Sequence, residues 1–255
     1  MDELALLVAC FFFAALRYLP VVAIPALSPF GSAPALVRLT LLFALAWLTV
    51  LAGSPVPFSV GSNGPPSLLL ACASELLIGL TLGLAILLPQ AAIGMSARLA
   101  DTQAGLSAAS LFNPGGQHEP ESLFGTVVLL GAGVLFFTLD LHVLLFRVLA
   151  SSVLAMPLGG IGLHLDMDAW LAMVGRSFVL GLAVVAPVIL GLFMLDIGIA
   201  YATRSMPQAN VYFLALPLKV AVALLLLALT LAFAPALVGR LYFDTLSRVP
   251  AVFGA

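Results

Sequence analysis

Charged residues are scarce in this chain. Only 8% of its 255 residues are Asp, Glu, Lys or Arg, whereas 63% are hydrophobic. A soluble domain typically carries about 25% charged residues. A soluble core of this size could not bury so much apolar surface, and the remainder would aggregate. The composition therefore excludes an ordinary soluble protein and indicates that a lipid bilayer is the natural solvent of the chain.

Clusters of basic residues and of metal ligands are also missing. The nine Lys and Arg residues are scattered singly and the formal net charge is -2, so no basic patch is available to bind nucleic acid. The two cysteines, Cys10 and Cys72, both lie within apolar runs. We expect them to be buried small hydrophobic residues, because the sequence offers no partners for a disulfide or a metal site. No cofactor is expected.

Enzyme motifs are absent as well. The sequence has no HExxH zinc motif, no GxSxG nucleophile elbow and no glycine-rich phosphate-binding loop. Its three histidines, His118, His142 and His164, are far apart along the chain. Asp140 lies two residues from His142, a spacing that places an acid and a base on different faces of a helix. We therefore expect a protein that is not an enzyme.

Long apolar runs are abundant instead. Each is near or above the roughly 20 residues that an α-helix needs to cross a bilayer. The runs are apolar on every side, whereas the strands of a membrane barrel would alternate polar and apolar residues. The six predicted helices cover 4–27, 36–52, 68–97, 123–150, 170–200 and 211–237.

Proline and glycine divide and bend these predicted helices. Helix-breaking residues fill the connectors 28–34 and 53–66. Prolines inside the runs each remove a backbone donor and tend to kink the helix. These prolines are Pro20, Pro25, Pro89, Pro187, Pro217 and Pro235. We expect an all-α polytopic membrane protein of about six long, proline-bent helices arranged as hairpins, in a single domain that covers 1–255.

The N-terminus and the connectors give weaker signals. Asp2 and Glu3 stand where a cleaved signal peptide would carry basic residues, so we expect the first helix to be retained. Arg38, Arg98 and Arg204 lie near the first, third and fifth connectors, which favours a cytoplasmic location for these connectors. Two arginines near the C-terminus argue against the resulting topology, so the orientation of the chain stays open.

Several charged residues lie inside or near the apolar runs. A charge in hydrocarbon costs about 2.5–3.5 kcal/mol on insertion scales, so such residues usually face protein or water and have partners. Arg17, Glu75 and Asp196 are expected to be buried packing residues, with Arg17 paired to Glu75. A proton relay and contacts with other subunits are the alternatives. Gly79 and Gly83 form a GxxxG pattern that permits a close approach between helices.

Five short segments, read in combination, carry a family resemblance. They are 75–79 (ELLIG), 103–107 (QAGLS), 113–114 (NP), 207–211 (PQANV) and 216–219 (LPLK). Together they resemble the family of the flagellar biosynthesis protein FliR and its injectisome counterparts, the T-type subunits of the type III secretion export apparatus. The length and the six-span layout match this family along nearly the whole chain. Ala209 is a departure, since the family commonly has a larger apolar residue there.

The resemblance implies a role in protein export. Family members are present as a single copy in a helical export gate, with several copies of two other small membrane subunits, and contacts with the switch and export-platform membrane subunits are expected. Unfolded secreted proteins pass through this gate. The implied location is the bacterial inner membrane, at the base of the flagellar basal body or injectisome, with the flagellar system favoured. The expected partners include membrane lipid but no nucleic acid. A secondary transporter or small channel is the alternative function.

The resemblance also implies site residues. The segment 105–121 corresponds to a plug that projects into the closed pore, and its apolar side chains can block a narrow lumen; a solvent-exposed connector is the alternative. The expected plug residues are Gly105, Leu106, Ser107, Leu111, Phe112, Asn113 and Pro114. The expected buried packing residues are Arg17, Glu75, Gly79, Gly83, Asp196, Pro207, Asn210 and Lys219. Among them, Pro207 is expected to fix a turn and Asn210 to cap the helix that follows.

Overall fold

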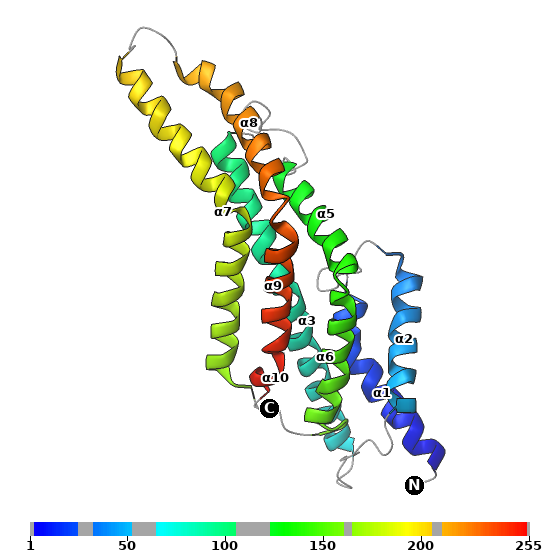
Figure 1. Cartoon of the computed structure of the whole chain (residues 1–255). Helices are drawn as coiled ribbons and strands as arrows, with labels where there is room; N and C mark the ends of the chain where they lie inside the picture. The colour runs from blue at the N-terminus through cyan, green and yellow to red at the C-terminus, as the bar shows by residue number, and fades with distance from the viewer. Residues whose placement is uncertain are drawn as a thin grey trace, which may run out of the picture. The chain divides into compact units, whose positions relative to one another are not determined.

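A computed structural model of the chain describes residues 3–24, 33–52, 65–105, 123–160, 165–205 and 211–253. Helices account for nearly all of these residues, and no strand is found among them. The all-α fold expected from the sequence is therefore confirmed. The helices are α1 (Glu3–Val22), α2 (Ala35–Ala52), α3 (Pro65–Ala104), α5 (Leu123–Thr138), α6 (Leu141–Ala155), α7 (Met167–Ser205), α8 (Val211–Thr230), α9 (Ala234–Ser247) and α10 (Val249–Val252) (Figure 1).

The two longest helices extend beyond the predicted apolar runs. α3 continues to Ala104 and ends because Gly105 adopts a left-handed backbone conformation with φ 79°, a common way for a helix to stop. α7 begins at Met167 because the Asp166 carboxylate accepts the backbone N–H groups of Asp168 and Ala169, at 3.0 and 3.1 Å. Polar residues at helix ends thus add length that hydropathy alone did not predict.

Two of the six predicted helices are broken, which corrects the expectation of continuous helices over 123–150 and 211–237. α5 and α6 are separated by Asp140, whose φ of 55° is left-handed, and the chain bends by 71° there. α8 and α9 meet at an angle of 68° after Thr230. In the second break Pro235 lacks the N–H that would continue the helical hydrogen bonds, so the predicted kink at this proline becomes a complete interruption.

Three helices in the described part of the chain are long and apolar enough to cross a membrane: α1, α3 and α7. The number rises to five if each bent pair counts as one span, and α2 is a shorter apolar helix. The described helices thus have the lengths and composition of a helical membrane protein.

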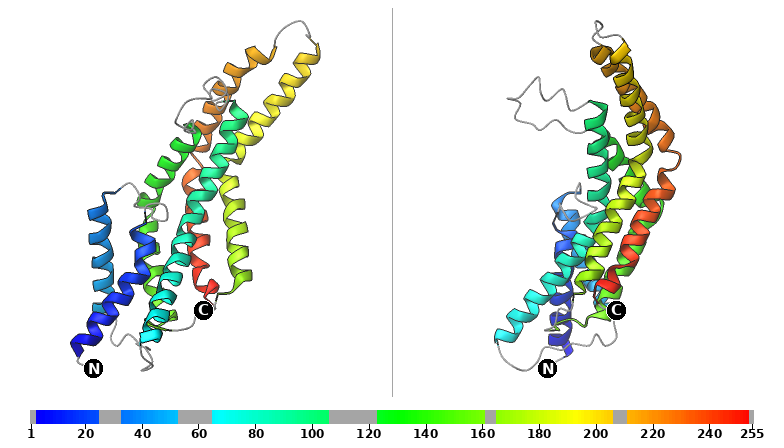
Figure 2. Two further views of the ribbon diagram at one scale, coloured as in Figure 1. Left: turned by 180° about the vertical axis from the view of Figure 1, so that it is seen from behind. Right: turned by 90° about the vertical axis from the view of Figure 1, so that its left-hand side faces the viewer.

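The helices group into two compact units. Unit 1 contains Met1–Leu88, Asp140–Gly175 and Phe243–Ala255. In it α1 and α2 lie side by side (Figure 2), with the rings of Phe11 and Phe43 stacked at a centroid distance of 6.1 Å. Arg38 of α2 donates hydrogen bonds to the carbonyl oxygens of Ala23, at 2.8 Å, and Ala33, at 3.2 Å. Because Ala23 directly follows α1, Arg38 holds the end of α1 against the start of α2.

Unit 2 contains Pro89–Leu139 and Arg176–Tyr242. Within it α7 and α8 run as a hairpin (Figure 2). A close helix crossing lies at Gly181 of α7, where an added Cβ would be 2.6 Å from the Cβ of Ala92 and 2.8 Å from its backbone carbon. Glycine is required here because no side-chain movement could relieve a clash with the backbone of α3.

The crossing at Gly181 predicts a large difference between two glycines of the same helix. Gly181→Ala should lower the free energy of unfolding by about 1–3 kcal/mol through overpacking. Gly198→Ala is the matched control, since a Cβ there has no neighbour within 4 Å among the described residues. The control should leave stability unchanged or raise it by up to about 1 kcal/mol. Melting temperatures of the detergent-solubilised variants measure both effects, and equal destabilisation would show that the crossing at Gly181 is not close.

Candidate functional site

A fully buried ion pair joins α1 to α3 in unit 1. Arg17 and Glu75 both have side chains that are 0% exposed. The Arg17 Nε–H donates to Glu75 Oε2 at 2.5 Å, and its Nη2 donates to Glu75 Oε1 at 2.9 Å. This two-point geometry matches the planar guanidinium to the planar carboxylate. The structure thus contains the pair that the sequence predicted.

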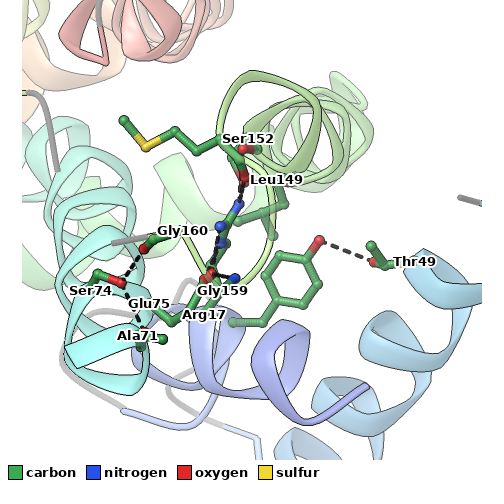
Figure 3. Close-up of polar contacts among 11 residues, drawn as sticks. Arg17, Thr49, Ala71, Ser74, Glu75, Leu149, Ser152, Gly159 and Gly160 are labelled. Atoms are coloured by element: carbon green, nitrogen blue, oxygen red, sulfur yellow. Dashed lines mark hydrogen bonds and ion pairs between the residues drawn. The ribbon is translucent and has the colours of Figure 1, made fainter. Parts of the chain in front are cut away.

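The same two side chains also hold the chain around the end of α6. Arg17 Nη1 donates to the backbone carbonyl oxygen of Ser152 at 2.9 Å (Figure 3). It also donates to that of Met156 at 2.9 Å. Glu75 Oε1 accepts the backbone N–H of Gly159 at 2.8 Å. The guanidinium therefore binds two carbonyls at the end of the helix, of which that of Ser152 also accepts the backbone N–H of Met156 at 3.0 Å. The carboxylate satisfies a buried donor just beyond the helix.

A hydroxyl next to Glu75 extends this network. Ser74 Oγ lies 2.7 Å from the carbonyl oxygen of Gly160 and 2.8 Å from that of Ala71, and donates towards both (Figure 3). Gly159 itself has a left-handed φ of 77°, which turns the chain so that its N–H reaches Glu75. Three separate stretches of sequence are thus fastened at one point: α1, α3 and the segment that follows α6.

Gly79 allows α1 and α3 to come close enough for this pairing. A Cβ at this position would collide with the backbone oxygen of Arg17 and lie 3.0 Å from Cδ of Pro20. The GxxxG prediction therefore identified a close helix contact at its first glycine. Gly83, the second glycine of the pattern, is buried.

The energetics of this network are asymmetric. Desolvating two charges offsets much of their attraction, so an intact buried pair contributes little net stability. Removing one partner is far more costly, about 3–5 kcal/mol, because the remaining charge is left buried and uncompensated. The network specifies which helices pack together, and its chemistry suits a packing device rather than a reaction.

A second ion pair lies in unit 2. Lys219 of α8 pairs with Asp196 of α7, and the two side chains are 13% and 39% exposed. The sequence predicted both as buried packing residues, without predicting that they meet, and the structure leaves both partly exposed. Since they come from the two arms of the α7–α8 hairpin, the pair fixes the register of the hairpin.

A third polar contact joins the two helices that flank the segment predicted to form a plug. Asp101, in the last turns of α3, accepts the backbone N–H of Phe124 at the start of α5, at 3.1 Å. Both residues are buried. The chain leaves α3 at Gly105 and returns at Leu123, so this hydrogen bond ties the two ends of the segment together. The sequence offers little signal for this contact, because Asp101 lies beyond the predicted apolar run, among Arg98, Thr102 and Gln103, and its partner is a backbone group that no residue pattern reveals.

The other predicted site residues lie outside the part of the chain that the structure describes. They are Leu106, Ser107, Leu111, Phe112, Asn113, Pro114, Pro207 and Asn210. The predicted plug and the predicted turn before α8 therefore stay predictions.

Fold and site together define a helical membrane protein in which pairs of charged side chains join its helices. Residues 8–245 match the family described as bacterial export proteins, family 1. The chain belongs to this family, which confirms the resemblance found in the sequence.

Named relatives include flagellar biosynthetic proteins and a Yop translocation protein. The flagellar biosynthetic protein FliR of Aquifex aeolicus is 30% identical over 199 residues, covering 78% of this chain and 76% of the relative. FliR of Pectobacterium carotovorum is 29% identical, covering 69% of this chain and 68% of the relative. The Yop proteins translocation protein T of Yersinia pestis is 28% identical, covering 64% of this chain and 63% of the relative.

The ion pair in unit 1 predicts different outcomes for two substitutions of Glu75. Glu75→Leu should lower the free energy of unfolding by about 3–5 kcal/mol, because it leaves Arg17 buried without a counter-charge. Glu75→Gln should cost less, since an amide oxygen still accepts hydrogen bonds. The double variant Arg17→Met with Glu75→Leu should be more stable than Glu75→Leu alone. Melting curves in detergent test this order, and a double variant less stable than the single one would contradict it.

The ion pair in unit 2 predicts recovery after a charge swap. Asp196→Lys should destabilise the α7–α8 hairpin by about 1 kcal/mol, because it opposes two positive charges at a partly exposed site. Combining Asp196→Lys with Lys219→Asp should restore most of this loss. The resistance of the hairpin to protease in detergent measures both the loss of stability and its restoration. If the swapped variant is as sensitive as the single one, then the two side chains do not set the register.

Proposed function

We propose that this chain is a core subunit of the type III protein export gate, with the flagellar export apparatus favoured over the injectisome. The family match over residues 8–245 is the observation that carries the proposal. The flagellar assignment is supported by FliR of Aquifex aeolicus, which aligns over 78% of the chain, whereas the Yop protein aligns over 64%. The two units are proposed to act as one gate domain covering 1–255, and α3 contributes residues to both.

The surface of the chain supports a role inside a larger membrane assembly. Large apolar side chains stay uncovered on several helices, for example Leu69 of α3 at 73%, Leu130 of α5 at 67% and Met194 of α7 at 65%. Such a surface requires lipid or other apolar helices as cover. The proposed partners are two other small membrane subunits in several copies each, and the switch and export-platform membrane subunits. The proposed place of the assembly is the bacterial inner membrane, at the base of the flagellar basal body or injectisome.

The charged residues support the gate over the alternative of a secondary transporter. A transporter would use charged groups near its centre to bind a solute or relay protons. Arg17 and Glu75 instead hold each other and the end of α6, and Asp196 holds Lys219. Charged residues used in this way suit a structural subunit in the wall of a channel through which unfolded substrates pass.

The segment that follows Gly105 is proposed to be the plug of the gate. Its ends are fastened by the hydrogen bond between Asp101 and Phe124, so its middle can change without separating α3 from α5. Leu106, Leu111 and Phe112 supply apolar side chains that would close a narrow lumen by excluding water. Pro207 and Asn210 are proposed to form the turn that leads into α8.

Deleting Ser107–Phe112 should open the gate without dismantling it. The complex should still assemble, because the anchored ends at Asp101 and Phe124 are retained. Small solutes should then cross the membrane, since the closed state has lost its apolar block. The measurement is conductance, or sensitivity to normally excluded solutes, in cells that express the deleted chain together with the partner subunits.

Two controls separate the possible results. The same deletion without the partner subunits should give no leak, because one chain cannot enclose a pore wide enough for a protein. Asp101→Asn, which keeps an acceptor for the N–H of Phe124, should neither leak nor prevent assembly. An assembled deletion complex that stays tight would refute the plug. Failure of the unaltered chain to co-purify with any export subunit would refute the gate.

A further inference from the structure

α6 and α9 are the second limbs of the two bent helix pairs (Figure 1). The two helices share one pattern of exposure. In each helix the third, seventh, tenth and fourteenth residues are exposed. In α6 these residues are Val143, Arg147, Ala150 and Leu154. In α9 they are Ala236, Arg240, Phe243 and Ser247. We call these two sets the α6 stripe and the α9 stripe.

The buried faces of the two helices correspond as well. The fifth, eighth, ninth, twelfth and thirteenth residues are buried in both, and the twelfth is a buried hydroxyl in each, Ser152 and Thr245. Spacings of three and four residues place each stripe along a single side of its helix, as in the seam where two helices pack. The same design thus occurs twice in the chain, with one face packed inward and a narrow face left open.

Each stripe contains one arginine at its seventh position. Arg147 and Arg240 are both exposed, and neither side chain has a hydrogen bond or an ion pair with any residue in the described ranges. Six residues separate each arginine from the start of its helix, about 9 Å along the axis. Large apolar side chains share the stripes, with Leu154 86% exposed and Phe243 60% exposed. Asp244, one turn after Arg240, is hydrogen-bonded to Arg248. A guanidinium that another apolar helix covers requires a counter-charge.

We infer that the α6 stripe and the α9 stripe are two equivalent docking faces, each for an apolar helix that carries an Asp or Glu opposite the arginine. The occupant is another membrane subunit of the apparatus, so this inference rests on the proposed function. A carboxylate would engage the guanidinium at two points, as Glu75 engages Arg17 within this chain. A second copy of the chain fits less well, because an antiparallel contact through either stripe would place its central arginine against itself.

Charge-dependent crosslinking tests this inference in the full chain, expressed with the other membrane subunits. A photoreactive residue replaces Ala150 for the α6 stripe or Ala236 for the α9 stripe. Arg147→Glu should reduce the Ala150 crosslink to another subunit by at least about tenfold, because it opposes two carboxylates. Arg147→Lys should keep it within about twofold. Arg240→Glu should leave the Ala150 crosslink unchanged and abolish the Ala236 crosslink.

A control variant and a mass analysis test whether the effect is specific to the two stripe arginines and whether the partner helix carries a carboxylate. Arg204→Glu reverses another exposed arginine, in the last turn of α7, and should change neither crosslink. Mass analysis of the crosslinked peptides, which needs no charge variant, should find an Asp or Glu within about one helical turn of the attachment point.

Separate outcomes overturn the inference and the proposed function. Four results would overturn the inference that the stripes are docking faces. The crosslink yield could be independent of the charge at Arg147 and Arg240, or the crosslinks could join two copies of this chain. They could also reach only lipid, or a helix without a carboxylate. The proposed function would survive those results as long as other export subunits co-purify with the chain. Absence of co-purifying subunits would overturn both.

Discussion

The structure depends on a buried ion pair in which neither partner can be removed alone, because the other charge would then stay buried and uncompensated. Arg17 and Glu75 are both fully buried, and together they bind each other, two carbonyls near the end of α6 and the N–H of Gly159. Because lipid offers no polar substitute, α1, α3 and the segment after α6 must meet at this point. Gly79 makes the meeting possible by letting α3 approach the backbone of α1. The pair therefore specifies the arrangement of helices more than it adds net stability.

In unit 2, as in unit 1, a small number of polar contacts join the helices. Asp196 with Lys219 joins the arms of the α7–α8 hairpin, and Asp101 closes the base of the segment after Gly105. Most of the buried side chains in the described helices are apolar, and large apolar side chains are left over on the surface. A chain with so much uncovered apolar surface fits a subunit that is completed by other membrane proteins.

The sequence predicted the features that depend on composition and on strongly marked residues. The all-α membrane fold follows from the apolar runs, and the Arg17–Glu75 pair from the rule that charges at membrane depth need partners. The break at Pro235 has a sequence signal, whereas the break at Asp140 has none beyond a single acidic residue. The contacts of Arg17 with Ser152 and of Asp101 with Phe124 could not be predicted, because one partner in each is a backbone group. The shared exposure pattern of α6 and α9 appears only when burial is known, since few of their side chains are identical.

We propose that this chain is one packed subunit of a larger export gate. The most direct test is the mass of the intact assembly, measured after gentle detergent extraction from the native membrane. We expect a defined hetero-oligomer that contains this chain in a single copy together with several copies of two other small membrane subunits. A stable monomer or homo-oligomer of this chain that moves a small solute across a reconstituted membrane would contradict it.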